Sequence, residues 1–254
     1  PYTARSPRAK FFTNYSDLEV NWSNLNQPIC PKLFDQYWLA SKAYLKYEDL
    51  YYVGDHAQHR LPFVLRTEKS WHQIFATQLF FSQNQAQNDW VIHCAPSYKA
   101  SEEHPVLVAI CLKSHRILIS GTAYAGEIKK SLFSVMNYLL PKKNILPMHC
   151  AAISCREETT LILGLSGTGK TSLSSSSCFE LIGDDEHAWC DEGIFNIEAG
   201  CYAKCANLSK EAEPDIYRAV QNHGVLENVF IDPNGQPDFS NTSLTQNSRG
   251  AFSL

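Results

Sequence analysis

Residues 160–174, TLILGLSGTGKTSLS, run from an apolar segment into a glycine-rich turn and then a lysine. From Gly164 to Thr171 the stretch fills every fixed position of the pattern G-x-x-x-x-G-K-[ST]. Glycines let backbone N–H groups surround phosphate oxygens, because no Cβ stands in the way. A helix that begins near Lys170 would point its positive end at the same anion. We therefore predict a strand, a phosphate-binding loop and a helix that together hold a nucleoside triphosphate.

The side chains of this loop and of a later acidic turn predict a metal beside the nucleotide. Lys170 offers a cation to the β- and γ-phosphates, and Thr171 offers a hydroxyl to a bound Mg²⁺. In LIGDDEH, residues 181–187, Asp184 and Asp185 follow a short apolar strand. Taken alone they could form a solvated acidic turn, but behind a phosphate loop carboxylates at a strand end commonly hold the metal.

Composition limits the classes of protein to which the chain can belong. An apolar fraction of 44% in 254 residues fits a globular chain with a buried core. The net charge of -4 argues against a nucleic-acid partner, and no 18-residue apolar run predicts a membrane span. The nine cysteines form no C-x-x-C pair, so we expect reduced thiols and a cytoplasmic location. Both ends are abrupt, and we expect the chain to be part of a longer one.

The pattern along the chain predicts an α/β fold. We expect a mixed α/β N-terminal domain at 1–145, followed by a partial P-loop mononucleotide-binding domain at 146–254. Helical spacing of apolar residues marks 67–82 and 126–141. The runs that read as strands in the first half are LPFVLR (61–66), WVIHCA (90–95), VLVAICL (106–112) and RILISG (116–121).

Five segments in one order resemble the ATP-dependent phosphoenolpyruvate carboxykinase family. They are YAGEIKKSLFSVMNYLLP (124–141), MHCAA (148–152), GLSGTGKT (164–171), LIGDDEH (181–187) and GCYAKCANLSKEAEPDIY (200–217). The resemblance covers nearly the whole chain and is strongest at 121–217. It implies conversion of oxaloacetate and ATP to phosphoenolpyruvate, CO₂ and ADP in gluconeogenesis, with Mn²⁺ and Mg²⁺ as cofactors. The family's chain is about twice as long, and its later half holds the adenine pocket, so we expect this piece alone to be inactive; the oligomeric state stays open.

The resemblance also implies roles for individual residues. Lys130, His149 and Asp185 match the protein ligands of Mn²⁺, with Lys130 neutral when it binds, and Asp184 would act behind them. Substrate contacts are implied for Arg5, which matches the arginine that grips the carboxylate, and for Tyr124, Gly126 and Ser166. Nucleotide contacts are implied for Gly164, Gly167, Thr168, Gly169, Lys170, Thr171, Lys204 and Glu213. Arg249 matches the arginine that bridges the γ-phosphate and the developing enolate.

Some neighbouring residues are expected to lie outside the site. Lys129 is predicted to face solvent on its helix, and His187 to be a structural hydrogen-bond partner. Ala4 and Ala125 stand where the family pattern has glycine, which bears on how substrate is positioned and not on the ligand set.

Two alternative functions remain. One is a P-loop kinase of the HPr-kinase-like type, and the other is an inactive truncated copy that binds triphosphate weakly. Lys130 and His149 distinguish the first from a carboxykinase, because a plain kinase needs no transition-metal site with a lysine and a histidine.

Overall fold

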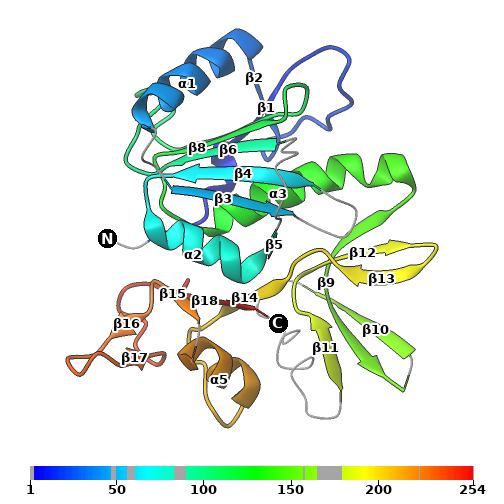
Figure 1. The fold of residues 1–254 in the computed structure, drawn as a ribbon, viewed down its shortest axis with the longest axis vertical. Coiled ribbons are helices and arrows are strands. Elements are labelled where there is room, and N and C mark those ends of the chain that lie inside the picture. The colour runs from blue at the N-terminus through cyan, green and yellow to red at the C-terminus, as the bar shows by residue number, and fades with distance from the viewer. Residues whose placement is uncertain are drawn as a thin grey trace.

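The protein is described by a computed structural model that covers residues 3–46, 50–55, 61–82, 90–156, 158–164, 179–222 and 224–253. Helices and several sheets alternate along the chain, so the predicted α/β class is confirmed (Figure 1). Of the glycine loop only Gly164 belongs to the described residues. The predictions for Ser166, Gly167, Thr168, Gly169, Lys170 and Thr171 therefore fall outside them.

The first half of the chain builds an eight-stranded mixed sheet in the order β2-β1-β7-β8-β6-β4-β3-β5. The four strands expected from sequence are all present. The strands are β1 (Lys10–Thr13), β2 (Gln27–Ile29), β3 (Leu50–Asp55), β4 (Pro62–Thr67), β5 (Phe81–Ser82), β6 (Trp90–Ala95), β7 (Leu107–Cys111) and β8 (Arg116–Ser120).

Helices cover both faces of this sheet, which explains why its central strands are continuously apolar. Successive side chains of β7 alternate between two cores. Leu107 and Ala109 pack with α1 (Pro31–Tyr44), whereas Val108 and Ile110 pack with α3 (Gly126–Leu139). The predicted helix at 126–141 is thus α3, followed by the short 3₁₀ turn η2 (Pro141–Lys143), and the one at 67–82 is α2 (Ser70–Leu79). Another 3₁₀ turn, η1 (Pro7–Ala9), precedes β1.

The second half is organised around the long strand β9 (Leu146–Cys155). It pairs antiparallel with β10 (Glu158–Leu163), β11 (Glu180–Gly183) and β12 (Glu186–Cys190), and β13 (Gly193–Asn196) continues the sheet. Because β10 and β11 both pair with Ile153, they lie on opposite sides of β9 and run in the same direction. Their carboxyl ends, at Leu163 and Gly183, therefore reach the same end of the sheet.

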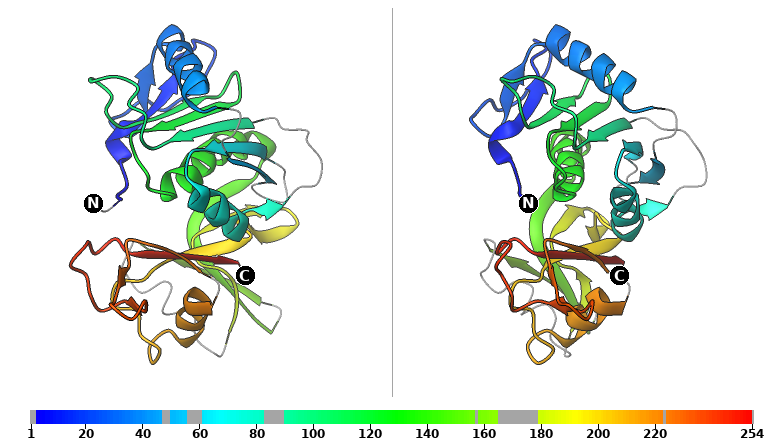
Figure 2. Two further views of the ribbon diagram at one scale, coloured as in Figure 1. Left: turned by 60° about the vertical axis from the view of Figure 1, so that its left-hand side comes forward. Right: turned by 90° about the vertical axis from the view of Figure 1, so that its left-hand side faces the viewer.

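A third sheet packs under α2. Its order is β14-β18-β15, from β14 (Gly200–Lys204), β18 (Arg249–Ser253) and β15 (Val225–Glu227). The remaining elements are α5 (Pro214–Asn222), β16 (Phe230–Ile231) and β17 (Pro237–Asp238). One apolar core runs from Phe75 of α2 to Tyr202 and Ala251 of this sheet, so the two halves of the chain share buried contacts. Figure 2 shows α2 lying over the third sheet. The domain division at 145/146 coincides with the change of sheet and stays a prediction.

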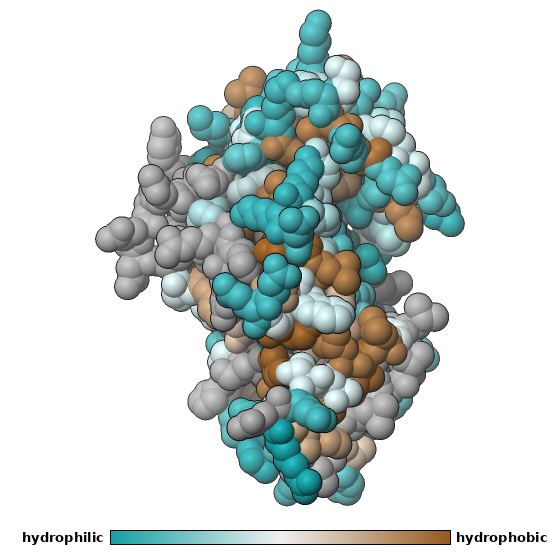
Figure 3. Space-filling view, turned by 90° about the vertical axis from the view of Figure 1, so that its right-hand side faces the viewer, coloured by the Kyte–Doolittle hydropathy of each residue, from teal (hydrophilic) through white to brown (hydrophobic). Residues whose placement is uncertain are grey.

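Apolar side chains gather on one face of the lower half of the molecule (Figure 3). Large exposed apolar residues come from β9, β10, β12 and the residue before β11, namely Leu146, Leu163, Trp189 and Phe179. Within the described parts of the chain, every helix is too short or too polar to cross a membrane.

Candidate active site

The first turns of α3 bring two adjacent lysines toward an acidic break between β11 and β12. Lys130 Nζ lies 2.7 Å from Glu186 Oε1 and 3.3 Å from Asp185 Oδ2. The carboxylates lie there because β11 ends at Gly183 and the chain bends at residues 184–185 before β12 begins. Two of the predicted metal ligands, Lys130 and Asp185, are thereby in direct contact.

His149 joins the same group from β9. Its Nδ1 lies 2.8 Å from Asp185 Oδ1 and 3.1 Å from the Asp185 carbonyl oxygen. The pairing of His149 with Glu186 in the ladder between β9 and β12 sets this distance. The imidazole is half exposed, and within the described part of the chain its Nε2 has no hydrogen-bond partner. The structure therefore brings Lys130, His149 and Asp185 together.

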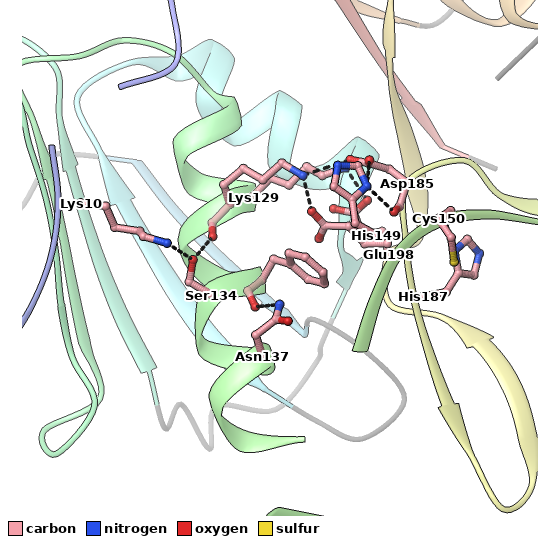
Figure 4. Close-up of polar contacts among 12 residues, drawn as sticks. Lys10, Lys129, Ser134, Asn137, His149, Cys150, Asp185, His187 and Glu198 are labelled. Carbon is pink, nitrogen blue, oxygen red and sulfur yellow. Dashed lines mark hydrogen bonds and ion pairs between the residues drawn. The ribbon is translucent and has the colours of Figure 1, made fainter. Parts of the chain in front are cut away.

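The prediction that Lys129 faces solvent is wrong. Only 1% of its side chain is exposed, and its Nζ lies 2.6 Å from Asp185 Oδ2 and 2.7 Å from Glu198 Oε2. Figure 4 shows Lys129, His149, Asp185 and Glu198 converging between α3 and the strands. The physical reason is that β9, β12 and the segment around Glu198 cover the first turn of α3, so its polar face is buried as well as its apolar face.

The two lysines and the surrounding carboxylates shift one another's pKa values. Burial would raise the pKa of Asp185, but the charges of Lys129, His149 and Lys130 outweigh it and hold the pKa well below its usual range. Burial would lower the pKa of Lys130, yet Glu186 outweighs it and the pKa is raised. Burial raises the pKa of Glu198 to about 7. Without a metal, the group thus holds Asp185 as a carboxylate between two ammonium groups.

Asp184 points into the protein. It is buried, and burial together with the adjacent Asp185 charge raises the pKa of its carboxyl group. Its side chain hydrogen-bonds the Cys201 thiol of β14. The role predicted for Asp184, behind the predicted metal ligands, stays a prediction. His187 is buried too, with Nδ1 2.8 Å from the Cys150 carbonyl oxygen, so its predicted structural role is confirmed (Figure 4).

A cleft of about 470 Å³ opens beside the lysine and the histidine. Its lining includes Arg5, Lys10, Glu127, Lys130 and His149. The loop carrying Arg5 is attached to α3, because the Ser6 N–H donates a 2.7 Å hydrogen bond to Glu127 Oε1. Of the six titratable Arg, Lys, His and Glu side chains in the lining, four can carry positive charge and two, Glu19 and Glu127, are carboxylates, so the cleft suits an anionic ligand.

Tyr124 and Gly126 lie at the start of α3 and are buried. A Cβ on Gly126 would stand 2.5 Å from Cε1 of Tyr124, so glycine is what allows the ring to lie against the helix. The Tyr124 ring in turn faces Tyr202 of β14, with ring centroids 6.2 Å apart.

The predicted nucleotide residues of the last third lie on the β14-β18-β15 sheet and near it. Arg249 begins β18 and is paired across the ladder with Lys204 of β14 and Glu227 of β15. Its guanidinium lies 5.8 Å from the centre of the Tyr202 ring. Burial raises the pKa of the Cys205 thiol, while the positive charge of Arg249 lowers it and the negative charge of Glu213 raises it, so both charged groups lie near this thiol. Within the described residues no contact joins this group directly to His149 or Lys130.

The strand register places the start of the glycine loop near the lysine–histidine–aspartate group. Leu163, the residue before Gly164, pairs with Cys150, and Glu186 pairs with His149. Gly183, at the end of β11, pairs with Ala152. The last residue of β10, the acidic turn and His149 therefore share one end of the sheet, as a phosphate loop with a metal beside it requires.

The donor set fits a divalent transition metal. One amine nitrogen, one imidazole nitrogen and one carboxylate converge from three elements, and Mn²⁺ accepts both nitrogen and oxygen ligands. No group of three or more His, Cys, Asp and Glu side chains in the described part of the chain could hold a metal. The lysine is therefore essential to this assignment.

Sequence reasoning missed Lys129, Glu186 and Glu198 as members of this buried charged group. Glu186 follows the two predicted aspartates directly, and strand alternation would have placed it on the same face of β12 as Ala188, which is also buried. Lys129 and Glu198 carry no comparable signal, because they meet only when residues distant in sequence pack together.

Comparison with known proteins identifies the family to which the chain belongs. The family model for phosphoenolpyruvate carboxykinase matches residues 1–254. Proteins named phosphoenolpyruvate carboxykinase (ATP) from Bacillus velezensis, Shouchella clausii and Bacillus subtilis are 43%, 45% and 40% identical to the chain. The matches cover 100% of the chain and 52%, 51% and 52% of these relatives, so the chain spans about half their length. The chain belongs to the phosphoenolpyruvate carboxykinase family.

Proposed function

We propose that a chain of the relatives' length containing this segment converts oxaloacetate and ATP to phosphoenolpyruvate, CO₂ and ADP, in the cytoplasm and in the direction of gluconeogenesis. The observation that carries the proposal is the contact of Lys130, His149 and Asp185 at the edge of a cleft that Arg5 also lines. Family membership favours this function over a P-loop kinase of the HPr-kinase-like type. All eight cysteines of the described residues are free, which agrees with a reducing compartment.

The cleft suits the substrate because oxaloacetate is a dianion. Arg5, which lines the cleft, would grip one carboxylate through its planar guanidinium. The contact of Tyr124 with the substrate rests on the family resemblance. The bond between the departing carboxylate and its carbon breaks, CO₂ leaves, and the electron pair moves onto the carbonyl oxygen as an enolate. That oxygen takes the γ-phosphoryl group, and ADP leaves.

Lys130, His149 and Asp185 would hold Mn²⁺, and Thr171 would contact the nucleotide's Mg²⁺. A bound divalent cation supplies Lewis-acid stabilisation of negative charge on the reacting oxygens. The protein's own task is alignment and charge neutralisation, for which Lys170 and Arg249 would serve the γ-phosphate. Asp184 and the Lys129–Glu198 pair would fix Asp185 in place.

The test compares this chain with a version extended to the relatives' length. Mn²⁺- and ATP-dependent formation of phosphoenolpyruvate is measured in both, with Lys130→Ala as the control. Activity in the longer chain that the substitution abolishes supports the proposal. ATP binding without phosphoenolpyruvate from either chain would instead favour the kinase or the inactive copy.

A further inference from the structure

Glu227 and Asn228, at the end of β15, contact the chain segments that carry Arg5 and Arg249, the two arginines of the proposed function. Glu227 is buried, with 5% of its surface exposed. Its Oε1 accepts hydrogen bonds from the Thr3 hydroxyl and, at 3.3 Å, from the Ala125 N–H. Its Oε2 accepts a hydrogen bond from the Tyr202 hydroxyl. One carboxylate thus joins the N-terminal segment, the start of α3 and β14.

Asn228 adds further hydrogen bonds to the N-terminal segment. Its Oδ1 accepts a 2.8 Å hydrogen bond from the Thr3 N–H, and its Nδ2 donates a 2.8 Å hydrogen bond to the Thr3 carbonyl. The residue has φ of 58°, the left-handed conformation that Asn tolerates well. Thr3, two residues before Arg5, is thus held through both its N–H and its carbonyl oxygen. The N-terminal end lies next to the third sheet (Figure 2).

The same two residues set the position of Arg249. Glu227 is its ladder partner, and the Asn228 Nδ2 also donates a 3.1 Å hydrogen bond to the Asn247 carbonyl. Asn247 Oδ1 in turn accepts a 3.3 Å bond from Arg249 Nε. Tyr202 lies near two residues of the proposed site, because its ring centre is 5.8 Å from the Arg249 guanidinium and 6.2 Å from the centre of the Tyr124 ring.

We propose that Glu227 and Asn228 form a positioning clamp that holds Arg5 and Arg249 in one fixed relation, so that the carboxylate-binding and phosphate-facing arginines act on one bound substrate. Neither clamp residue is assigned to contact the substrate. The inference rests on the proposed function. A buried carboxylate that accepts three hydrogen bonds is held rigidly. Rigid positioning matters because a displacement of the reacting groups by about 1 Å can lower the reaction rate about a hundredfold.

The kinetic test uses a chain of the relatives' length that contains this segment. Thr3→Val removes the hydroxyl donor on the Arg5 side only, so we expect the KM for oxaloacetate to rise about tenfold with little change in kcat. Asn228→Asp keeps size and backbone conformation but loses the bonds to both carbonyls. We therefore expect a higher KM for oxaloacetate and a lower kcat, each by about tenfold.

Non-additivity provides a second kinetic readout. Glu227→Gln should raise the KM for oxaloacetate, and Thr3→Val added to it should have little further effect, because the two residues share one hydrogen bond. The matched controls are the exposed Glu192→Gln and the exposed, left-handed Asn207→Asp, which should behave as the unsubstituted enzyme. Unchanged KM and kcat in Thr3→Val and Asn228→Asp would overturn the clamp.

If no phosphoenolpyruvate forms, the proposed function is refuted but the clamp is not. A conformational measurement then tests the clamp by itself. Tryptic cleavage after Arg5 should accelerate about fivefold in Thr3→Val and in Asn228→Asp, the effect of losing about one hydrogen bond. Cleavage after the exposed Lys113 is the internal reference. Equal cleavage after Arg5 in the variants and the unsubstituted chain would overturn the clamp.

Discussion

Lys129 Nζ lies 2.6 Å from Asp185 Oδ2, whereas the predicted metal ligand Lys130 lies 3.3 Å from the same oxygen. Two adjacent helix residues thus form ion pairs with the same carboxylate oxygen, but one lysine is buried and the other is partly exposed. Lys129 is enclosed with Glu198, while Lys130 keeps 21% of its side chain exposed at the cleft. The inner lysine fixes the aspartate, and the outer one remains accessible for a metal.

This arrangement predicts different consequences when each lysine is removed. Lys129→Met removes the positive charge that pairs with the buried carboxylates of Glu198 and Asp185. The loss should lower the free energy of unfolding by about 3–5 kcal/mol. Denaturant unfolding of the chain measures the change. Lys130→Met should cost less, because its position is partly open to water.

The matched control for Lys129 is Lys113→Met, since Lys113 pairs with Asp17 at the surface and should matter little to stability. Adding Glu198→Gln to Lys129→Met should recover part of the loss, because the amide carries no charge. If Lys129→Met unfolds like Lys113→Met, the buried pair does not stabilise the fold.

Gly126→Ala should disturb the Tyr124 ring. The added Cβ would lie 2.5 Å from that ring, and overpacking of this kind costs about 1–3 kcal/mol. In the extended enzyme we expect a raised KM for oxaloacetate. Tyr124→Leu combined with Gly126→Ala removes the close contact and should restore stability without restoring KM. A Gly126→Ala variant with normal stability and normal KM would show that the Tyr124 ring can move to another position without cost.

His93 predicts a particular dependence of stability on pH. It is buried against Trp38, with ring centroids 3.8 Å apart, and burial lowers its pKa to about 3. The unfolded chain takes up a proton near pH 6.5, whereas the folded chain does not until about pH 3. The contribution of this residue to stability is therefore present above pH 6.5 and is lost as pH falls toward 3.

His93→Phe keeps the ring stack and removes the titration. The unfolding free energy of the unsubstituted chain, minus that of the variant, should fall by about 1.4 kcal/mol per pH unit below pH 6. The difference between the two proteins is needed because Glu198, whose pKa is raised to about 7, makes both folded proteins more stable as pH falls. This effect is the same in both proteins and cancels in the difference. Parallel pH profiles for the two proteins would contradict the prediction.

The regular elements around the site were predictable because local patterns determine them. The apolar spacing of residues 126–141 predicted α3, and the short apolar run before Asp184 predicted β11. The contact of His149 with Asp185 was inferred by resemblance, and local patterns could not supply it, because it depends on β9 pairing with β12.

The burial of Lys129 could not be read from the sequence. Helical periodicity marks the face with Ile128, Leu132 and Val135 as buried, and Lys129 lies off that stripe. It becomes enclosed only because strands from the second half of the chain cover the first turn of α3. Similarly, the bonds of Thr3 to Glu227 and Asn228 join residues more than two hundred positions apart.

The last prediction concerns the metal. Lys130→Arg retains the positive charge that pairs with Glu186 and Asp185, but a guanidinium stays protonated and has no lone pair to offer. We expect it to weaken Mn²⁺ binding at least about tenfold, and His149→Ala to do the same, as measured by electron paramagnetic resonance titration of the chain.

Because a lysine must lose its proton to bind a metal, Mn²⁺ binding to the unsubstituted chain should release a proton and strengthen as pH rises. Lys142→Ala, a surface change in η2, is the control and should bind Mn²⁺ normally. Lys130→Arg with undiminished Mn²⁺ affinity would exclude Lys130 as a ligand and leave Asp185 and His149 to bind the metal with partners other than this lysine.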